Sequence, residues 1–312
     1  RYLYCFFSFI SSLYTGVDGD RENFITYYSM ENYTELYLDV AHEIVSTSWY
    51  DPSKPTLMIT HGFTGYPEGP AMTAMVTAYL AQGEYNVALL NWDRLAAMAL
   101  PGLLNSYMNW AIPNSIQVGA NFAETLVKLS SVGIDVNRMT FVGHSLGAHV
   151  FGSAGNRIKE KGEQLTCIIG LDPATGFDLK PSYFRLNPNS ARFTAALHTD
   201  PHKYGSKREL GFVNFWPNFR GFGSTVLQPG CPDSSSQRFS DDDFCSHNRS
   251  WKLWIEAMQN PGSILGSHAR NFKVWNRYSK EQREANVLPL GVCDENSYFV
   301  SQNATAKWWT FY

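Results

Sequence analysis

Short apolar runs alternate with segments of helical periodicity along most of the chain. The apolar runs are four to seven residues long, which is typical of buried strands, and the intervening segments carry apolar residues at helical spacing. Strands are predicted over residues 56–60, 87–91, 139–142, 165–171 and 192–197, and helices over 70–82, 114–130 and 146–161. This alternation predicts an α/β fold with a mostly parallel sheet and helices on both faces.

The boundaries of two helices and the flanking regions complete this picture. Gly83 is placed to end the helix over 70–82, and Asn114 is placed to cap the next helix. Residues 21–49 resemble antiparallel edge strands, and residues 201–246 are rich in loop-forming residues. We find no internal repeat and no second domain after about residue 278, so residues 21–312 are expected to form a single domain.

The first twenty residues form an apolar N-terminal extension. Residues 2–14 are mostly apolar and follow Arg1, which resembles the apolar region of a signal peptide. Because there is no initiating Met, we favour a retained segment that packs on the body or on another subunit; processing upstream of Arg1 is the alternative. No apolar stretch reaches 18 residues, so no membrane-spanning helix is predicted.

Composition and charge narrow the class of partner. The 312 residues are 44% hydrophobic, which is enough for a sizeable core, and the formal net charge is −3. No basic run is present, so nucleic acid is not expected as a partner.

Five cysteines bear on the cellular compartment. Cys231 and Cys245 enclose 13 residues of largely polar character, which favours a loop-closing disulfide. Cys167 lies in an apolar run and is expected to be a buried thiol. Cys5 and Cys293 remain, and whether they pair is left open. Sequons for N-glycosylation occur at Asn32, Asn248 and Asn303; together with the expected disulfide they favour a secreted protein.

The stretch Gly143-His144-Ser145-Leu146-Gly147 matches the G-x-S-x-G pattern between a predicted strand and a predicted helix. Such a turn exposes a serine hydroxyl at the end of a sheet, and its glycines leave room where strand and helix crowd together. A serine needs a histidine base and an orienting carboxylate, which in α/β-hydrolases follow in the order Ser, acid, His. Asp172, at the end of the next strand, and His247 satisfy that order.

Other histidines compete with His247 for the role of base. His144 and His149 flank the nucleophile in the chain and are expected to be packing residues. His198 ends a predicted strand, and His202 lies in a loop. We therefore favour His247.

At this point the chain resembles the pancreatic-lipase family, especially its insect neutral lipases and phospholipases A1. The resemblance spans about residues 22–310, and its matching segments are residues 60–63, 143–149, 170–174, 198–200, 228–231 and 245–250. It implies an α/β-hydrolase fold in which Ser145 is the nucleophile, Asp172 the orienting acid and His247 the base. It also implies an oxyanion hole made by the backbone N–H groups of Phe63 and Leu146.

Two short loops depart from the family's triglyceride lipases, which carry a long amphipathic lid. The loop over 232–244, closed by the lid disulfide Cys231–Cys245, is short, polar and acidic, and the preceding loop over 201–209 is also brief. In the family, short versions of both loops accompany activity on phospholipids or galactolipids. The alternative is that the loop over 232–244 is only a solvated connector.

Two further departures concern metals and partners. The family's calcium site would lie near residues 185–188, but its acidic ligands are replaced here by Ser182, Asn187 and Ser190, so we predict no bound metal and no cofactor. Arg185 is expected to pair locally. We expect no C-terminal β-sandwich like that of the vertebrate lipases, so no colipase is implied. The aromatic end over 308–312 and the apolar start are candidates for a homo-oligomer interface or a membrane contact, or they pack on the domain edge.

Two hypotheses about function follow. The first is a secreted serine lipase that hydrolyses lipid carboxylic esters, either the sn-1 ester of a phospholipid or a small neutral glyceride, at a membrane or lipoprotein surface. The second is an egg-yolk storage or binding protein with the lipase fold, with or without esterase activity, held in yolk granules. Asn248 directly follows the proposed base, so its sequon is expected to be unused, which leaves Asn32 and Asn303.

Overall fold

The computed structural model describes residues 22–177, 180–221, 226–233, 237–285, 287–291 and 293, together with the backbone of residues 307–310. The predicted N-terminal extension, Cys5 and Asn303 lie outside the described residues.

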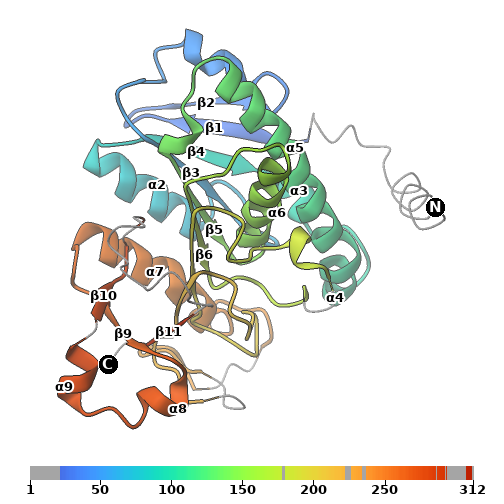
Figure 1. Ribbon diagram of the computed structural model, residues 1–312. Helices are drawn as coiled ribbons and strands as arrows, with labels where there is room; N and C mark the ends of the chain where they lie inside the picture. Colours follow the sequence, from blue (N-terminus) through green and yellow to red (C-terminus); the bar gives the residue numbers. More distant parts are fainter. Residues whose placement is uncertain are drawn as a thin grey trace.

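One twisted sheet runs through the molecule (Figure 1). Its strand order is β10-β9-β11-β8-β7-β6-β5-β3-β4-β1-β2. Strands β3 to β8 and β11 run parallel, and the antiparallel pairs lie at the two ends of the order. The strands are β1 Phe24–Tyr28, β2 Tyr33–Tyr37, β3 Thr56–Thr60, β4 Asn86–Asn91, β5 Met139–His144, β6 Cys167–Leu171, β7 Phe193–Leu197, β8 Val213–Phe215, β9 Leu265–Ala269, β10 Val287–Pro289 and β11 Lys307–Thr310.

Helices cover both faces of this sheet. In Figure 1, α5 and α6 lie on one face, and α2 and α7 lie on the other. The longer helices are α2 Pro70–Gln82, α5 Ile112–Ser131, α6 Leu146–Glu160 and α7 Cys245–Gln259. The short ones are α3 Asp93–Ala96, α4 Leu103–Ser106, α8 Phe272–Trp275 and α9 Lys280–Glu284, with a π turn over Tyr107–Ala111 and 3-10 turns over Ala41–Ser46, Val136–Arg138 and Ser182–Phe184.

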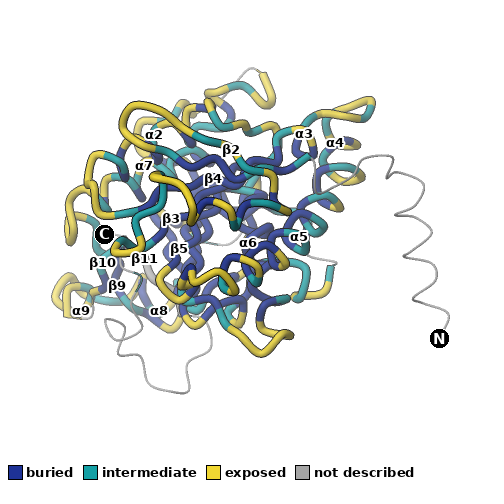
Figure 2. Tube along the Cα trace, turned by 90° about the horizontal axis from the view of Figure 1, so that it is seen from above, coloured by how far each residue is buried: buried dark blue, intermediate teal, exposed yellow. Residues whose placement is uncertain are grey.

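Two large apolar clusters form most of the core, one on each face of the sheet, and a small third cluster surrounds Trp216. The central strands are almost entirely buried (Figure 2). Beneath α5 and α6, the rings of Phe122, Phe141 and Phe151 pack with centroids 5.4–6.2 Å apart. Such tilted and edge-on pairs add to the stabilisation that burial of the rings provides. A Cβ atom at Gly119 would lie 2.6 Å from the carbonyl oxygen of Val150, so a glycine is needed where α5 crosses α6.

The predicted α/β architecture is confirmed, and the fold is that of an α/β-hydrolase. Gly83 ends α2 in the left-handed conformation, with φ 70°. The expected cap at Asn114 is wrong, because the helix already begins upstream with α4 and the π turn. Carbonyl groups of that turn already accept hydrogen bonds from the first N–H groups of α5, so these groups need no side-chain cap. The Asn114 side-chain amide donates instead to the carbonyl of Leu95 at 3.3 Å.

The disulfide pairing corrects one expectation and supports another. Cys167 is buried at the start of β6, but it is not a free thiol: it forms a disulfide with Cys293, with the Cα atoms 6.1 Å apart. This pairing leaves no place for a Cys5–Cys293 bond. A local apolar pattern cannot reveal a partner 126 residues away. The predicted Cys231–Cys245 disulfide is present.

Within the described part of the chain, no helix combines the length and apolar character needed to cross a membrane.

Candidate active site

The proposed nucleophile lies on a strained turn between β5 and α6. Ser145 has φ 56° and ψ −121°, a backbone conformation that costs free energy for a residue other than glycine. Its N–H donates to the carbonyl of Leu171 at 2.8 Å, and its carbonyl accepts from the N–H of Ala174 at 3.2 Å. These bonds tie the turn to the end of β6 and the loop that follows it.

The glycines of the motif are required by backbone contact. A Cβ atom at Gly143 would lie 2.5 Å from the carbonyl carbon of Gly147, and one at Gly147 would lie 2.5 Å from the carbonyl oxygen of His61. Strand, turn and helix therefore meet more closely than any larger residue permits.

The proposed acid, Asp172, directly follows β6 and is fully buried. One carboxylate oxygen, Oδ1, accepts hydrogen bonds from the N–H groups of Thr199 at 2.8 Å and Asp200 at 3.0 Å. The other, Oδ2, lies 2.5 Å from Nδ1 of His247. A Cβ atom at Gly205 would come within 2.4 Å of the carboxylate, so the neighbouring loop makes room for it.

The proposed base, His247, lies in the first turn of α7, two residues after Cys245. Because Nδ1–H donates to the carboxylate of Asp172, Nε2 is left free to accept a proton. The His247 ring packs against that of His144, with centroids 4.7 Å apart, so the base lies beside the nucleophile turn. The Ser145 hydroxyl makes no side-chain hydrogen bond to any residue that the structure describes. Such contacts are often loose without substrate.

Burial dominates the electrostatics of this group. It lowers the pKa of the His247 imidazole, and the Lys203 ammonium lowers that pKa further. Burial raises the pKa of Asp172, which the two N–H donors counteract. Burial and the neighbouring Asp172 carboxylate together raise the pKa of Asp200 to about 8. A neutral imidazole is the form that can act as a general base at neutral pH.

The predicted oxyanion donors lie next to the nucleophile. A Cβ atom at Gly62 would lie 2.6 Å from the Cβ of Ser145 and 3.0 Å from the nitrogen of Leu146, so the loop that carries Phe63 abuts the start of α6. Across the described residues, neither the N–H of Phe63 nor that of Leu146 has an acceptor in the protein. Two free N–H groups at this point fit an oxyanion hole.

Other histidines lie in structural roles. His149 donates from Nε2 to the carbonyl of Ala174 at 2.8 Å and accepts at Nδ1 from the N–H of Leu186 at 3.3 Å. His198 stacks on Trp216, and burial lowers its pKa to about 4. His202 lies in an exposed turn with φ 79°.

The loop over 182–190, where the calcium site of the family would lie, is filled by amides. Asn156, on α6, donates through Nδ2 to the carbonyls of Ser182, Tyr183 and Arg185 at 2.8–3.3 Å. Asn187 donates to two of these carbonyls and to Oδ1 of Asn156 at 3.0–3.2 Å. These amide nitrogens occupy the carbonyl oxygens that a cation would need. The cluster holds no carboxylate, so the residues do not fit a calcium ion.

The loop closed by Cys231–Cys245 is fixed beside His247 at its C-terminal end. The Asp243 carboxylate accepts from Lys203 Nζ at 2.7 Å, from the Tyr204 hydroxyl and from the N–H of Phe239 at 2.8 Å. The Tyr204 ring lies 4.5 Å from that of Phe244 and 5.8 Å from that of His247. An aromatic wall therefore flanks the proposed base.

Several of these contacts could not be predicted from the sequence. Asp200 was visible only as part of the family-like stretch over 198–200, and its contact with Asp172 could not be inferred from the chain. Neither Gly205 nor the Lys203–Asp243 pair carries any local pattern, since their partners lie 33 and 40 residues away.

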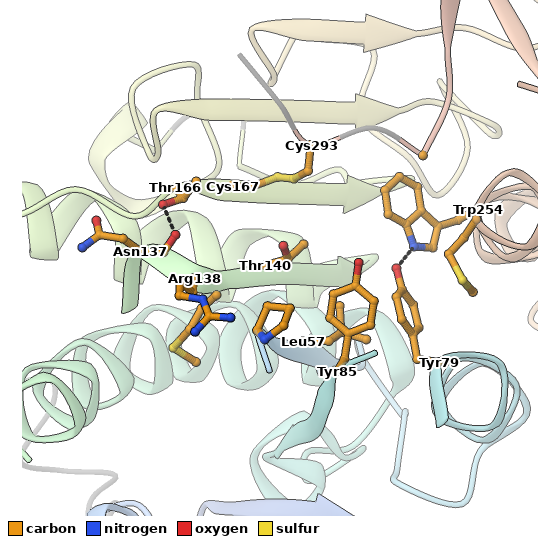
Figure 3. Close-up of a pocket in the computed structure, with 14 residues that line it drawn as sticks. Leu57, Tyr79, Tyr85, Asn137, Arg138, Thr140, Thr166, Cys167, Trp254 and Cys293 are labelled. Atoms are coloured by element: carbon orange, nitrogen blue, oxygen red, sulfur yellow. Dashed lines mark hydrogen bonds between the residues drawn. A yellow bond between two sulfur atoms is a disulfide. The ribbon is translucent and has the colours of Figure 1, made fainter. Parts of the chain in front are cut away.

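A cavity of about 440 Å³ lies away from this site (Figure 3). It opens beside the Cys167–Cys293 disulfide, near the amino ends of β3, β5 and β6, and Tyr79 and Trp254 line it from the helices. The proposed catalytic residues lie at the carboxyl ends of the strands, where ligands bind in open α/β sheets.

Comparison with known proteins defines the family. The model of the lipase family matches residues 18–283. The chain belongs to the pancreatic-lipase family. It is 32% identical to phospholipase A1 VesT1.02 of Vespa tropica over 67% of each chain. It is 33% identical to lipase member H-B of Xenopus laevis over 71% of this chain and 45% of that protein, so it spans less than half of that relative. The predicted class, a lipid ester hydrolase, is confirmed by this membership.

Proposed function

We propose that this lipase-family protein is a secreted serine hydrolase that cleaves a carboxylic ester of a lipid through an acyl-enzyme, with Ser145, Asp172 and His247 as its triad. The observation that carries this proposal is the buried Asp172–His247 pair, 2.5 Å apart, beside a serine held in a strained turn. A storage protein has no need for such strain, which makes this arrangement more typical of catalysis than of storage.

The reaction would proceed in two halves. Ser145 Oγ attacks the ester carbonyl carbon while His247 Nε2 takes the hydroxyl proton, and the N–H groups of Phe63 and Leu146 stabilise the oxyanion. Collapse of this intermediate expels the alcohol, which receives the proton from His247. Water then attacks the acyl-enzyme while His247 Nε2 takes its proton, and the imidazolium returns that proton to Ser145 Oγ as the fatty acid leaves. Asp172 stays ionised and stabilises the imidazolium.

The substrate would be a phospholipid, cleaved at the sn-1 ester, or a small neutral glyceride. The support for this choice is the short, acidic loop closed by Cys231–Cys245 and the wasp relative, which is named a phospholipase A1. A loop of 13 mainly polar and acidic residues is poorly suited to cover the bulk of a triglyceride surface.

Secretion is supported by the two disulfides. Asn32 is exposed in the turn between β1 and β2, as a glycosylated asparagine must be. Asn248, in contrast, lies half-buried next to His247.

A comparison of wild type with Ser145→Ala tests the proposal. Turnover of a short soluble acyl ester, a phosphatidylcholine and a triglyceride is measured for both proteins. We expect the variant to lose at least about 10⁴-fold in kcat on every ester that the wild type cleaves, because the nucleophile is removed. We also expect wild-type turnover of phospholipid to exceed that of triglyceride. Equal rates for both proteins on all three esters would refute an enzymatic role for this site.

A further inference from the structure

Left-handed backbone conformations occur at three residues of the proposed site. Ser145 and Asp172 belong to the proposed triad, and backbone strain of this kind is typical of active sites. The third residue, Thr64, directly follows the proposed oxyanion donor Phe63, but the triad mechanism gives it no role. Among the described residues other than glycine, φ is positive at Thr64, Ser145, Asp172, His202, Asn218 and Phe239.

Thr64 is the least expected of these residues in such a conformation. A β-branched side chain crowds its own backbone when φ is positive, so a φ of 58° costs free energy at a threonine. The side chain is exposed, and burial of its methyl group therefore does not offset that cost. A glycine would adopt the same conformation without strain.

The turn that contains Thr64 has glycine at its two ends but not at the strained position. The N–H of Gly65 donates to the carbonyl of Gly62 at 3.0 Å, which makes Thr64 the third residue of a closed four-residue turn. A Cβ atom at Gly62 would lie 2.6 Å from the Cβ of Ser145. One at Gly65 would lie 2.6 Å from the Cβ of His61, so both ends need glycine. The third position of a type II turn also favours glycine, yet threonine stands there.

Hydrogen bonds on each side hold this turn against the segment that follows β4. On one side, Nε1–H of Trp92 donates to the carbonyl of His61 at 3.0 Å. On the other, the N–H of Thr64 donates at 2.8 Å to the carbonyl of Ala96, the last residue of α3. A strained residue persists where the surrounding contacts over-determine its backbone in this way.

Thr64 also binds the peptide unit that joins it to Phe63. Its hydroxyl donates to the Phe63 carbonyl at 2.7 Å, while its N–H, on the other side of the same unit, donates to Ala96. Both polar groups of the unit are therefore engaged, and a reversed unit would lose these partners. Because Phe63 lies between this unit and the one that carries its own N–H, the two contacts restrict the direction of that N–H.

We propose that Thr64 is a positioning residue for the oxyanion hole: its hydroxyl holds the Phe63–Thr64 peptide in the orientation that aims the Phe63 N–H at the substrate carbonyl. The inference rests on the proposed function and deepens it. An oxyanion donor is most effective when its direction is fixed before the charge develops. The hydroxyl explains why threonine occupies a position whose backbone conformation favours glycine.

Three substitutions at this one position separate the hydroxyl from the strain. Thr64→Ser keeps the hydroxyl, Thr64→Val keeps the branched shape without it, and Thr64→Gly removes both the hydroxyl and the strain. On a soluble acyl ester, we expect kcat to change less than about twofold for the Ser variant and to fall about tenfold for the Val and Gly variants, with KM changed little. The loss should stay below the about 10²–10³-fold that removal of an oxyanion donor costs, because the Phe63 N–H is loosened rather than lost.

Two further measurements distinguish positioning from a structural role. Thr64→Gly should leave Tm unchanged or raise it, since relief of strain offsets the extra freedom that glycine gives the unfolded chain. The second measurement is inhibition by an alkylboronic acid. Its boron accepts the electron pair of Ser145 Oγ while the hydroxyl proton passes to His247, and a boronate oxygen then lies in the oxyanion hole. The inhibition constant should rise about tenfold in the Val and Gly variants and less than about twofold in the Ser variant.

Wild-type kcat in both the Val and the Gly variant would overturn the positioning role. So would a Ser variant that loses as much activity as the Val variant, or a Gly variant whose Tm falls together with its kcat. A wild-type protein that cleaves no ester, or whose activity survives Ser145→Ala, would instead contradict the proposed function, and this inference would fall with it.

Discussion

The nucleophile turn and the segment that carries the proposed base reach the same site by different means. Ser145 is placed by elements adjacent in the chain, β5 and α6, whose backbones touch at Gly143 and Gly147. His247 is placed by distant groups: Asp172 lies 75 residues away and Thr199, whose hydroxyl lies 3.4 Å from the His247 carbonyl, lies 48 residues away. The turn therefore depends on local packing, whereas the position of the base depends on contacts between segments.

This difference predicts which changes abolish function and which only loosen the fold. A residue that links the two regions should matter most for activity. A residue that holds either region alone should matter mainly for stability.

Asp172→Asn should have the largest effect, because Asp172 is the link between the regions. The amide cannot stabilise the imidazolium and favours the wrong tautomer of His247, so we expect kcat on a soluble ester to fall about 10³–10⁴-fold. The matched control is Asp200→Asn. Asp200 is buried next to Asp172, and no hydrogen bond joins its side chain to His247 among the described residues. Burial and the Asp172 carboxylate raise the pKa of Asp200, so a neutral amide is a mild replacement at this position.

The control should therefore change kcat less than about tenfold. Equal losses in the two variants would mean that the buried acidic pair acts as a unit, and the distinct role of Asp172 would have to be abandoned.

The same difference explains how far the sequence predicts the molecule. The strand–turn–helix around Ser145 carries its own signal in apolar periodicity and two glycines, so its elements are recovered from the chain alone. The pairing of Asp172 with His247 follows only from chain order and family resemblance. The partner of Cys167, the space at Gly205 and the Lys203–Asp243 contact carry no local signal, because each depends on how distant segments pack. Asn114 shows the opposite error, in which a local signal is present but misleads: a residue typical of helix caps lies inside a helix that begins earlier.

Removal of the Cys167–Cys293 disulfide should cost more stability than removal of Cys231–Cys245, but it should cost less activity. Replacing Cys231 and Cys245 by Ala opens the loop just before His247, which the disulfide closes across a sequence separation of 14 residues. The change should lower the unfolding free energy by about 3 kcal/mol and kcat/KM about tenfold. Replacing Cys167 and Cys293 opens a 126-residue separation at the amino ends of the strands. That pair should cost about 4–5 kcal/mol, with kcat/KM changed less than about twofold.

Urea unfolding and turnover of a soluble ester provide the two measurements. If the Cys167–Cys293 pair proved the more important for kcat/KM, the two edges of the sheet would be coupled more tightly than their separate contacts indicate.

Incubation with a metal chelator should have the smallest effect on stability and activity. It tests whether the loop beside α6 is held by protein hydrogen bonds alone. The loop over 182–190 is held to α6 by amide hydrogen bonds from Asn156 and Asn187, which satisfy the carbonyls that a cation would bind. Incubation with EDTA should therefore change neither the unfolding free energy nor kcat. Asn156→Ala, in contrast, should lower the unfolding free energy by about 1–3 kcal/mol, because the buried side chains of Asn187 and Ser190 lose the acceptor Oδ1 and the Tyr183 carbonyl loses its donor. A loss of stability in EDTA that calcium restores would show that an ion, rather than the local amides, holds this side of the site together.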